Sequence, residues 1–112
     1  MSGCIFCRIA SDAKAAGIVY SDERVVCFND INPQAPVHVL AVPRKHIEKL
    51  EDAAEDGMLE AVHKAIRSLV KEKGLDKTGY RVVINSGGDG GQAVPHLHFH
   101  LLGGRQLDWP PG

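Results

Sequence analysis

The sequence predicts an α+β protein with a mainly antiparallel, five-stranded sheet, and three observations support this prediction. Segments typical of strands and of one helix follow each other in the order β-β-β-α-β-β. Only residues 53–73 have the 3.6-residue periodicity of a long helix. Residues 96–102 read HLHFHLL, so histidine recurs at every second position, which is the repeat of a β-strand.

The N-terminal half is predicted to contain a short helix and three strands. Ile5, Phe6 and Ile9 have helical spacing and predict a short N-terminal helix over Ile5–Ala16. A loop with two prolines occupies residues 29–36. The strands are the apolar segments Ile18–Tyr20, Val25–Phe28 and Val37–Val42.

The C-terminal half is predicted to contain the long helix and two more strands. Gly74 follows the helical segment, as is typical of a helix C-terminus. Tyr80–Asn85 is rich in β-branched residues and predicts a strand, and the glycine-rich loop 86–92 separates it from the strand at 96–102. The tail, residues 103–112, has too much glycine and proline for regular structure. The apolar stripe of the helix consists of Leu59, Val62, Ile66, Leu69 and Val70.

Length and composition predict one domain, residues 1–112, and exclude several classes of function. The chain is 44% hydrophobic and 24% charged, which is typical of a soluble globular protein. Thirteen basic and 14 acidic residues give a net charge of −1, so no basic surface field favours a nucleic acid partner. No apolar run reaches the ~20 residues of a membrane span. The N-terminus lacks a signal-peptide pattern, so we expect a cytoplasmic protein with no membrane partner.

The three histidines of residues 96–102 are the strongest functional signal. In a strand, the imidazoles of His96, His98 and His100 would share one face, and the opposite face would be apolar. They could form a zinc site, or a row of groups that attack, orient or hydrogen-bond a substrate. A rise of ~3.3 Å per residue separates the first and third α-carbons by roughly 13 Å, so a straight strand brings at most two imidazoles to one ion.

The glycine-rich loop 86–92 suggests what the histidines meet. Glycine lets backbone N–H groups approach a ligand closely, and successive N–H groups can form a concave anion site. A hairpin turn is the alternative interpretation. Because the loop directly precedes the histidines, we interpret it as a phosphate site.

HLHFHLL resembles the signature of the histidine-triad (HIT) nucleotide-binding proteins. The resemblance covers most of the chain: residues 30–47, residues 85–106 and the tail LDWPPG are similar to the Hint branch, the purine nucleoside phosphoramidases. It implies the HIT fold and a homodimer whose sheets join across the subunit boundary. It also implies hydrolysis of purine nucleoside 5′-phosphoramidates, of the AMP-amine or acyl-AMP type, to the nucleoside monophosphate, with no catalytic cofactor.

The resemblance implies a two-step nucleotidyl transfer. His98 corresponds to the nucleophile, which forms a nucleotidyl-histidine that water then hydrolyses. His100 corresponds to a histidine that hydrogen-bonds the phosphate, and His38 to a histidine of the relay network beside the nucleophile. His96 is the first member of the triad. An imidazole has an ordinary pKa of about 6.5, so it is largely neutral and nucleophilic at pH 7. Without the resemblance, a buried structural histidine would be the simpler interpretation of His38.

The resemblance also implies a nucleotide-binding site. Asp30 and Ile31 correspond to positions that contact the ribose, and a turn-forming role is the alternative for Asp30. Trp109 corresponds to a tail residue that approaches the site across the dimer. The positions at the phosphate are Asn85, Gly91, Gln92 and Ala93. The apolar base pocket corresponds to Ile5, Phe6, Ile9 and Phe28, for which ordinary core packing is an equally good interpretation.

The three cysteines point to a second site. An odd number argues against a disulfide framework, and Cys4 and Cys7 form a C-x-x-C pair that fits half a zinc site or a redox pair. In several bacterial members of the family, two histidines complete such a zinc site, and they correspond here to His46 and His96. Four such ligands leave no open position, so the zinc would be structural.

Two other functions stay open. One is hydrolysis of dinucleotide polyphosphates, against which the Hint-like tail argues. The other is a nucleotide-binding regulatory or scaffold protein with weak catalysis. Ala93 keeps the second alternative open, because the phosphoramidases often have a serine there that assists at the phosphate and leaving group.

Overall fold

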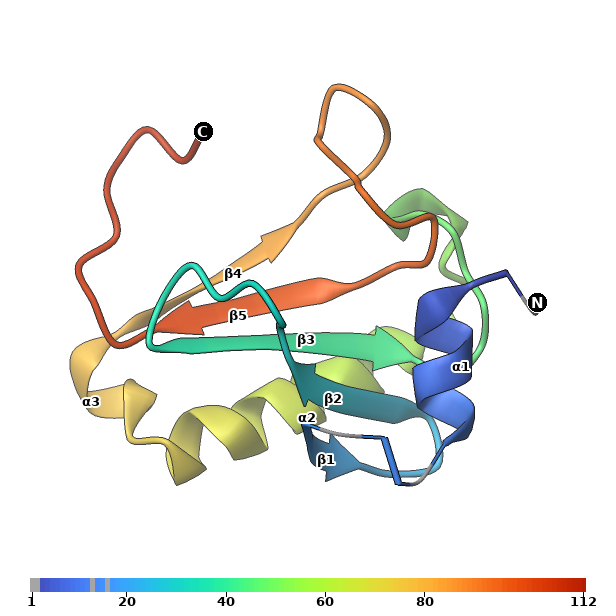
Figure 1. The fold of residues 1–112 in the computed structure, drawn as a ribbon, viewed down its shortest axis with the longest axis horizontal. Coiled ribbons are helices and arrows are strands. Elements are labelled where there is room, and N and C mark those ends of the chain that lie inside the picture. The colour runs from blue at the N-terminus through green and yellow to red at the C-terminus, as the bar shows by residue number, and fades with distance from the viewer. Residues whose placement is uncertain (1–2, 13, 16) are drawn as a thin grey trace.

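The computed structural model describes residues 3–12, 14, 15 and 17–112. Its strands form one sheet in the order β1-β2-β3-β5-β4 (Figure 1). Every neighbouring pair is antiparallel, which confirms the predicted fold class. The strands are β1 (Ile18–Ser21), β2 (Val25–Asn29), β3 (Val37–Pro43), β4 (Tyr80–Ile84) and β5 (Phe99–Gly103).

The helices lie around this sheet. The long helix α2 packs across one face, and α1 lies beside the end of β3 (Figure 1). The helices are α1 (Ile5–Ser11), the short 3-10 helix η1 (Leu50–Asp52), α2 (Met58–Glu72) and α3 (Leu75–Thr78). None of the helices in the described part of the chain is long and apolar enough to cross a membrane.

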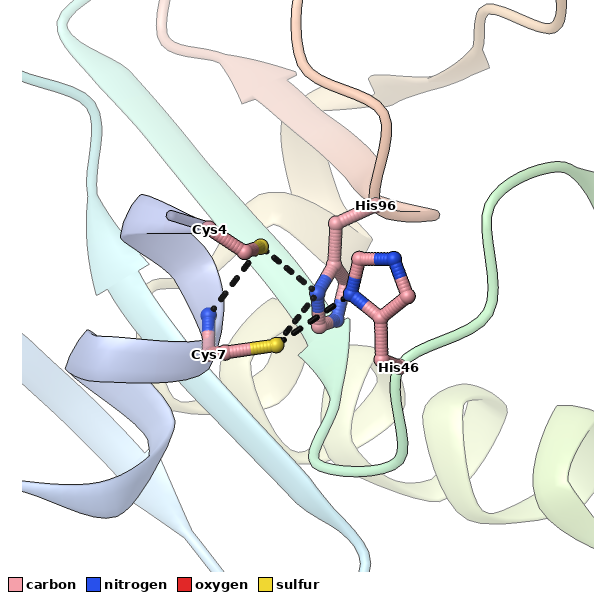
Figure 2. Close-up of side chains that lie close together, drawn as sticks. All are labelled: Cys4, Cys7, His46 and His96. Atoms are coloured by element: carbon pink, nitrogen blue, oxygen red, sulfur yellow. Dashed lines mark hydrogen bonds between the residues drawn. The ribbon is translucent and has the colours of Figure 1, made fainter. Parts of the chain in front are cut away.

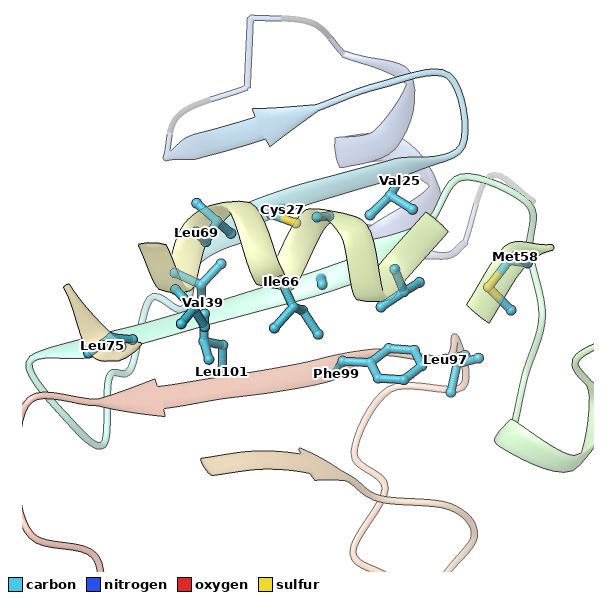
Figure 3. Packing of buried hydrophobic residues seen from close by; sticks show 14 of the residues in the cluster. Val25, Cys27, Val39, Met58, Ile66, Leu69, Leu75, Leu97, Phe99 and Leu101 are labelled. Carbon is cyan, nitrogen blue, oxygen red and sulfur yellow. The ribbon is translucent and has the colours of Figure 1, made fainter. Parts of the chain in front are cut away.

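The main core fills the space between α2 and the sheet (Figure 3). Leu97, Phe99 and Leu101 point into it, as the alternation in HLHFHLL predicts. Burying side chains of this size contributes about 1.5–3 kcal/mol each to the free energy of unfolding. The alternate positions of this segment therefore face away from α2, toward α1.

The predicted helix 53–73 is too long at its start. Helix α2 begins at Met58, because Gly57 has a φ of 88° and the Asp56 carboxylate accepts a hydrogen bond from the Met58 N–H at 3.1 Å. Leu59, predicted to lie in the apolar stripe, is 44% exposed, whereas the rest of the stripe is buried. Gly74 has a φ of 70° just beyond the helix, as its predicted role requires. The 3-10 helix and α3 were not predicted.

The N-terminal helix is also shorter than predicted. Helix α1 ends at Ser11, because Asp12 is extended and its N–H bonds back to the Ile9 carbonyl. Of the predicted extension to residue 16, Ala13 and Ala16 lie outside the described residues.

The histidine strand begins later than the predicted residue 96. Ladder pairing with both neighbours starts at Phe99, which lies opposite Ala41 and Ile84. Before it, the Leu97 N–H donates to the Ile47 carbonyl at 2.6 Å, outside the sheet. The sheet thus holds only the last triad histidine, and a loop that continues the same alternation carries the first two.

Gly103 at the end of β5 tests this packing. A Cβ there would lie 2.6 Å from a methyl carbon of Leu75, which is buried. We expect Gly103→Ala to destabilise the protein by about 1–3 kcal/mol through overpacking, measured by urea unfolding. Gly88→Ala is the matched control, because a Cβ there meets nothing within 4 Å. Equal unfolding midpoints for the two variants would contradict this packing.

Candidate functional site

The antiparallel register of β3 and β5 places two histidines together. His38 lies opposite Leu102, and His100 lies opposite Leu40, so the two imidazoles are diagonal neighbours on one face. Nε2 of His38 is 2.9 Å from Nδ1 of His100. Nε2 of His38 is also 3.3 Å from a carboxylate oxygen of Asp30.

Backbone contacts assign the proton on each of these rings. The Gln34 N–H donates to Nδ1 of His38 at 3.0 Å, so Nδ1 carries no proton. The neutral His38 ring therefore carries its proton on Nε2, which donates to Nδ1 of His100. His100 must then carry its own proton on Nε2. That atom is buried and has no hydrogen-bond partner in the described part of the chain.

The neighbouring ring has the opposite arrangement. Nδ1 of His98 lies 2.7 Å from the carbonyl oxygen of His96, which can only accept. The neutral His98 ring therefore keeps its proton on Nδ1 and has a lone pair on Nε2. The His98 and His100 ring centroids are 5.1 Å apart. A basic nitrogen and an unused N–H donor thus belong to adjacent rings, an arrangement suited to attacking and stabilising one phosphoryl group.

Burial keeps the relay histidines neutral. Desolvation is the main cause that lowers the pKa of His38, and it outweighs the opposing attraction of Asp30. Burial also lowers the pKa of His100, assisted by the nearby His98 and His38. A shift below the ordinary value of about 6.5 leaves both rings uncharged at pH 7.

Of the residues predicted to contact the ribose or to approach the site from the tail, only Asp30 lies beside the histidines. The Asp30 carboxylate faces His38, and its second oxygen accepts from the Asn32 N–H at 2.8 Å, which is the turn-forming role considered above. Ile31 is fully exposed and Trp109 is 80% exposed. Within one copy of the chain, the structure does not bring these two apolar residues to the histidines.

The predicted base-pocket residues are divided between two places. Phe6, Ile9 and Phe28 share a second apolar cluster, with the Phe6 and Phe28 rings 5.5 Å apart edge to face. Phe6 also packs against His98, with ring centroids 5.1 Å apart. Ile5 lies outside this cluster and is 44% exposed.

The glycine-rich loop is held by Gln92. Its side-chain oxygen accepts from the Gly87 N–H at 2.9 Å, and its amide nitrogen donates to the Glu48 carbonyl at 2.7 Å. Gly91 has a φ of 78°, which favours glycine. Asn85 is half-buried at the start of the loop, and Ala93 is exposed at its end. The Gln92 side chain thus shapes the loop.

The predicted metal ligands converge from three segments (Figure 2). Sγ of Cys4 is 3.3 Å from Nδ1 of His96, and Sγ of Cys7 is 3.2 Å from Nδ1 of His46 and 3.5 Å from Nδ1 of His96. Tetrahedral zinc bonds of about 2.3 Å to sulfur and 2.0–2.1 Å to nitrogen separate such ligands by ~3.6 Å. The four side chains therefore fit a zinc ion.

The orientation of His96 supports the same fit. Its Nε2 lies 2.8 Å from the carbonyl oxygen of Pro43, so it carries the ring proton and leaves Nδ1 as a lone pair toward both thiols. Histidine ligands of metals usually donate their other N–H in this way. The side chain is fully buried, and burial lowers its pKa, which keeps the ring in the neutral form that binds metal.

Two backbone groups that determine the proton positions on the histidine rings could not be identified from the sequence. The Gln34 N–H and the Pro43 carbonyl decide which nitrogens of His38 and His96 are free. A backbone amide has no residue-type signal, so only the geometry of the folded chain reveals these roles.

Comparison with known proteins identifies the family of this chain. A model of the HIT domain family matches residues 12–107, and the chain belongs to the HIT family. The crystal structure of a HIT family hydrolase from Legionella pneumophila is 44% identical, with a TM-score of 0.92 over 97% of this chain and 99% of that chain. These matches support a hydrolase of the HIT type.

Two more distant structures also match. A histidine triad nucleotide-binding protein from Candida albicans is 32% identical, with a TM-score of 0.83 over 96% of this chain and 82% of that chain. A zinc-bound histidine triad family protein from Mycobacterium smegmatis is 32% identical, with a TM-score of 0.78 over 96% of this chain and 79% of that chain.

The lowered pKa values of His38 and His100 predict acid sensitivity. The unfolded chain binds protons on these rings at a higher pH than the folded chain does. Their contribution to the free energy of unfolding is therefore complete above pH 6.5 and is lost as the pH falls through the folded-state pKa values. Urea unfolding at pH 7.5 and pH 5.5 should show this loss.

The variant His38→Asn should lose less stability between these two pH values than the parent. His63→Gln is the control, since His63 is exposed on α2. An equal or larger loss in His38→Asn would show that this ring is not held neutral.

Proposed function

We propose that this protein hydrolyses purine nucleoside 5′-phosphoramidates (AMP-amines), and the acyl phosphates of the acyl-AMP type, to the nucleoside monophosphate. The observation that carries the proposal is the pairing of ring nitrogens. Nε2 of His98 has a free lone pair because Nδ1 donates to the His96 carbonyl, and Nε2–H of the adjacent His100 has no partner among the described residues. A nucleophile and an oxyanion donor side by side suit displacement at phosphorus.

The reaction proceeds in two displacements. The Nε2 lone pair of His98 bonds to the α-phosphorus as the bond to the leaving group breaks, which is phosphorus–nitrogen in an AMP-amine and phosphorus–oxygen in acyl-AMP. The amine leaves with a proton taken from solvent, and the carboxylate leaves as the anion. Nε2–H of His100 donates to a phosphoryl oxygen, while Nδ1 of His100 accepts from Nε2–H of His38, whose ring faces the Asp30 carboxylate. Water then attacks phosphorus and loses a proton to solvent, the nucleotidyl-histidine bond breaks with its electron pair returning to Nε2, and the monophosphate leaves with His98 restored. No catalytic cofactor takes part.

The nucleotide lies beside this pair of rings. Phe6, Ile9 and Phe28 belong to an apolar cluster next to His98, in which Phe6 and Phe28 are buried, and we assign the purine base to this side of the ring. The Asp30 carboxylate accepts from the ribose hydroxyls with Ile31 beside it. The loop from Asn85 through Gly91, Gln92 and Ala93 contacts the phosphate. The name of the Candida albicans relative, a nucleotide-binding protein, agrees with this class of ligand.

Two copies form the functional unit in this proposal. Strand β4 is at the edge of the sheet, and its side chains Tyr80, Val82 and Ile84 are 36% or more exposed. An exposed apolar edge strand is suited to pairing with a second copy. Such pairing gives the exposed Trp109 a second copy to contact.

A structural zinc ion belongs to the same proposal. Cys4, Cys7, His46 and His96 satisfy a tetrahedral ion completely and tie α1 to the sheet. The zinc-bound relative from Mycobacterium smegmatis agrees with zinc in this family.

The first test measures AMP release from adenosine 5′-phosphoramidate. The parent should turn over, and His98→Asn should lose at least 10³-fold in kcat because no nucleophile remains. His100→Asn should lose about 10²–10³-fold, as when one oxyanion donor is removed. Equal release by the parent and His98→Asn would refute the nucleophile. Tight AMP binding with negligible turnover in the parent would indicate a nucleotide-binding regulatory or scaffold protein. Faster cleavage of a dinucleotide polyphosphate than of the phosphoramidate would indicate a dinucleotide polyphosphate hydrolase.

The second test measures zinc content after purification without chelators. The parent should carry one zinc ion per chain, and the Cys4→Ser/Cys7→Ser double variant should carry none. The exposed His63→Gln variant should keep its zinc. A molar ratio near zero in the parent after incubation with Zn²⁺ would remove the four-ligand site.

A further inference from the structure

We propose that the cysteine–histidine group formed by Cys4, Cys7, His46 and His96 is a positioning centre for His98, so that metal occupancy controls the reactivity of the nucleophile. The inference rests on the proposed function and deepens it. Two separate contacts connect the group to the His98 ring. One runs through the backbone of His96, and the other through the side chain of Phe6.

The first connection runs through His96, whose ring belongs to the cysteine–histidine group and whose backbone carbonyl contacts His98. The His96 ring is fully buried, with Nδ1 facing the two thiols and Nε2 bonded to the Pro43 carbonyl. The carbonyl of the same residue accepts from Nδ1 of His98 at 2.7 Å. This hydrogen bond alone determines which nitrogen of His98 is nucleophilic. A shift of the His96 ring moves the carbonyl that orients the nucleophile.

The second connection uses helix α1. Phe6 lies between the two cysteines in sequence, and its ring packs edge to face on both His96 and His98, with centroids 5.9 and 5.1 Å away. A helix of seven residues is not stable by itself. Its position therefore depends on what attaches it to the sheet. Apolar packing of Phe6 and Ala10 and a hydrogen bond from the Arg44 guanidinium to the Ala10 carbonyl hold the body of the helix. The thiols of Cys4 and Cys7 attach its N-terminal turn.

Without metal, the attachment through the two thiols is weak. A thiol is a poor hydrogen-bond donor, and the four thiol and imidazole ligands meet only through contacts of 3.2–3.5 Å. A zinc ion replaces these contacts by four bonds. A cleft of about 450 Å³, lined by Cys4, His46 and Ala93 among others, opens beside the group and gives ions and chelators access to it.

A purely structural centre would behave differently. It would raise the melting temperature and leave kcat unchanged wherever the protein stays folded. A positioning centre changes kcat in the folded protein and moves the His98 ring. Groups that orient metal ligands and catalytic side chains typically alter activity 10–100-fold.

The experiment compares zinc-loaded protein, chelated protein and chelated protein with zinc restored, below the melting temperature of each. Removal of zinc should lower kcat for adenosine 5′-phosphoramidate about tenfold or more and change KM less, and zinc should restore kcat. The long-range ¹H–¹⁵N signals of the His98 ring, assigned through His98→Asn, should shift on chelation. His63→Gln should respond to chelation as the parent does.

Cadmium provides a second measurement in case the chelated chain unfolds. Cd²⁺ has the charge of Zn²⁺ but is larger, so it keeps the fold while it displaces His96 and Phe6 slightly. We expect kcat to fall about threefold or more and the His98 signals to move. Unchanged kcat and unchanged His98 signals with zinc, with cadmium and, if it stays folded, without metal would overturn the inference.

The same experiment separates the two proposals. If the zinc-loaded parent releases no AMP, the proposed function fails and the NMR measurement alone decides the inference. If it releases AMP but kcat and the His98 signals do not change with the metal, the inference fails and the proposed function stands.

Discussion

A neutral imidazole has one donor and one acceptor, and this limit determines the chemistry of the site. Once the Gln34 N–H occupies Nδ1 of His38, the proton positions of His38 and His100 are both determined. Because Nδ1–H of His98 donates to the His96 carbonyl, Nε2 of the neutral ring has only a lone pair to offer. A single backbone amide and a single backbone carbonyl thus make neighbouring histidines chemically different.

The limit holds only while the rings stay neutral, and burial provides that condition. His38 has a carboxylate, Asp30, within 3.3 Å, which would favour a charged imidazolium. Desolvation is the larger effect on its pKa, so the relay remains an uncharged chain of hydrogen bonds. If His38 were charged, its Nδ1 would be a second donor facing the Gln34 N–H, and that contact would break. Burial therefore maintains the asymmetry between His98 and His100.

The fold class could be predicted from the sequence because it depends on periodicity and residue type. Alternation in HLHFHLL predicted which side chains face the core. The C-x-x-C pair indicated half a metal site, and the resemblance to the HIT family implied His46 and His96 as the other two members of the group that the fold assembles. The strand boundary at Phe99 could not be predicted, because it depends on where the neighbouring strands end. The start of α2 depends on the left-handed Gly57, which interrupts an otherwise helical pattern. The proton positions depend on backbone groups and have no sequence signal.

Neutron diffraction from crystals grown in deuterated solvent at neutral pH tests the central claim most directly, because it locates the deuterons on each ring. The account requires deuterium on Nδ1 of His98 and on Nε2 of His100, with Nε2 of His98 and Nδ1 of His100 bare. Deuterium on Nε2 of His98, or on Nδ1 of His100, would contradict it.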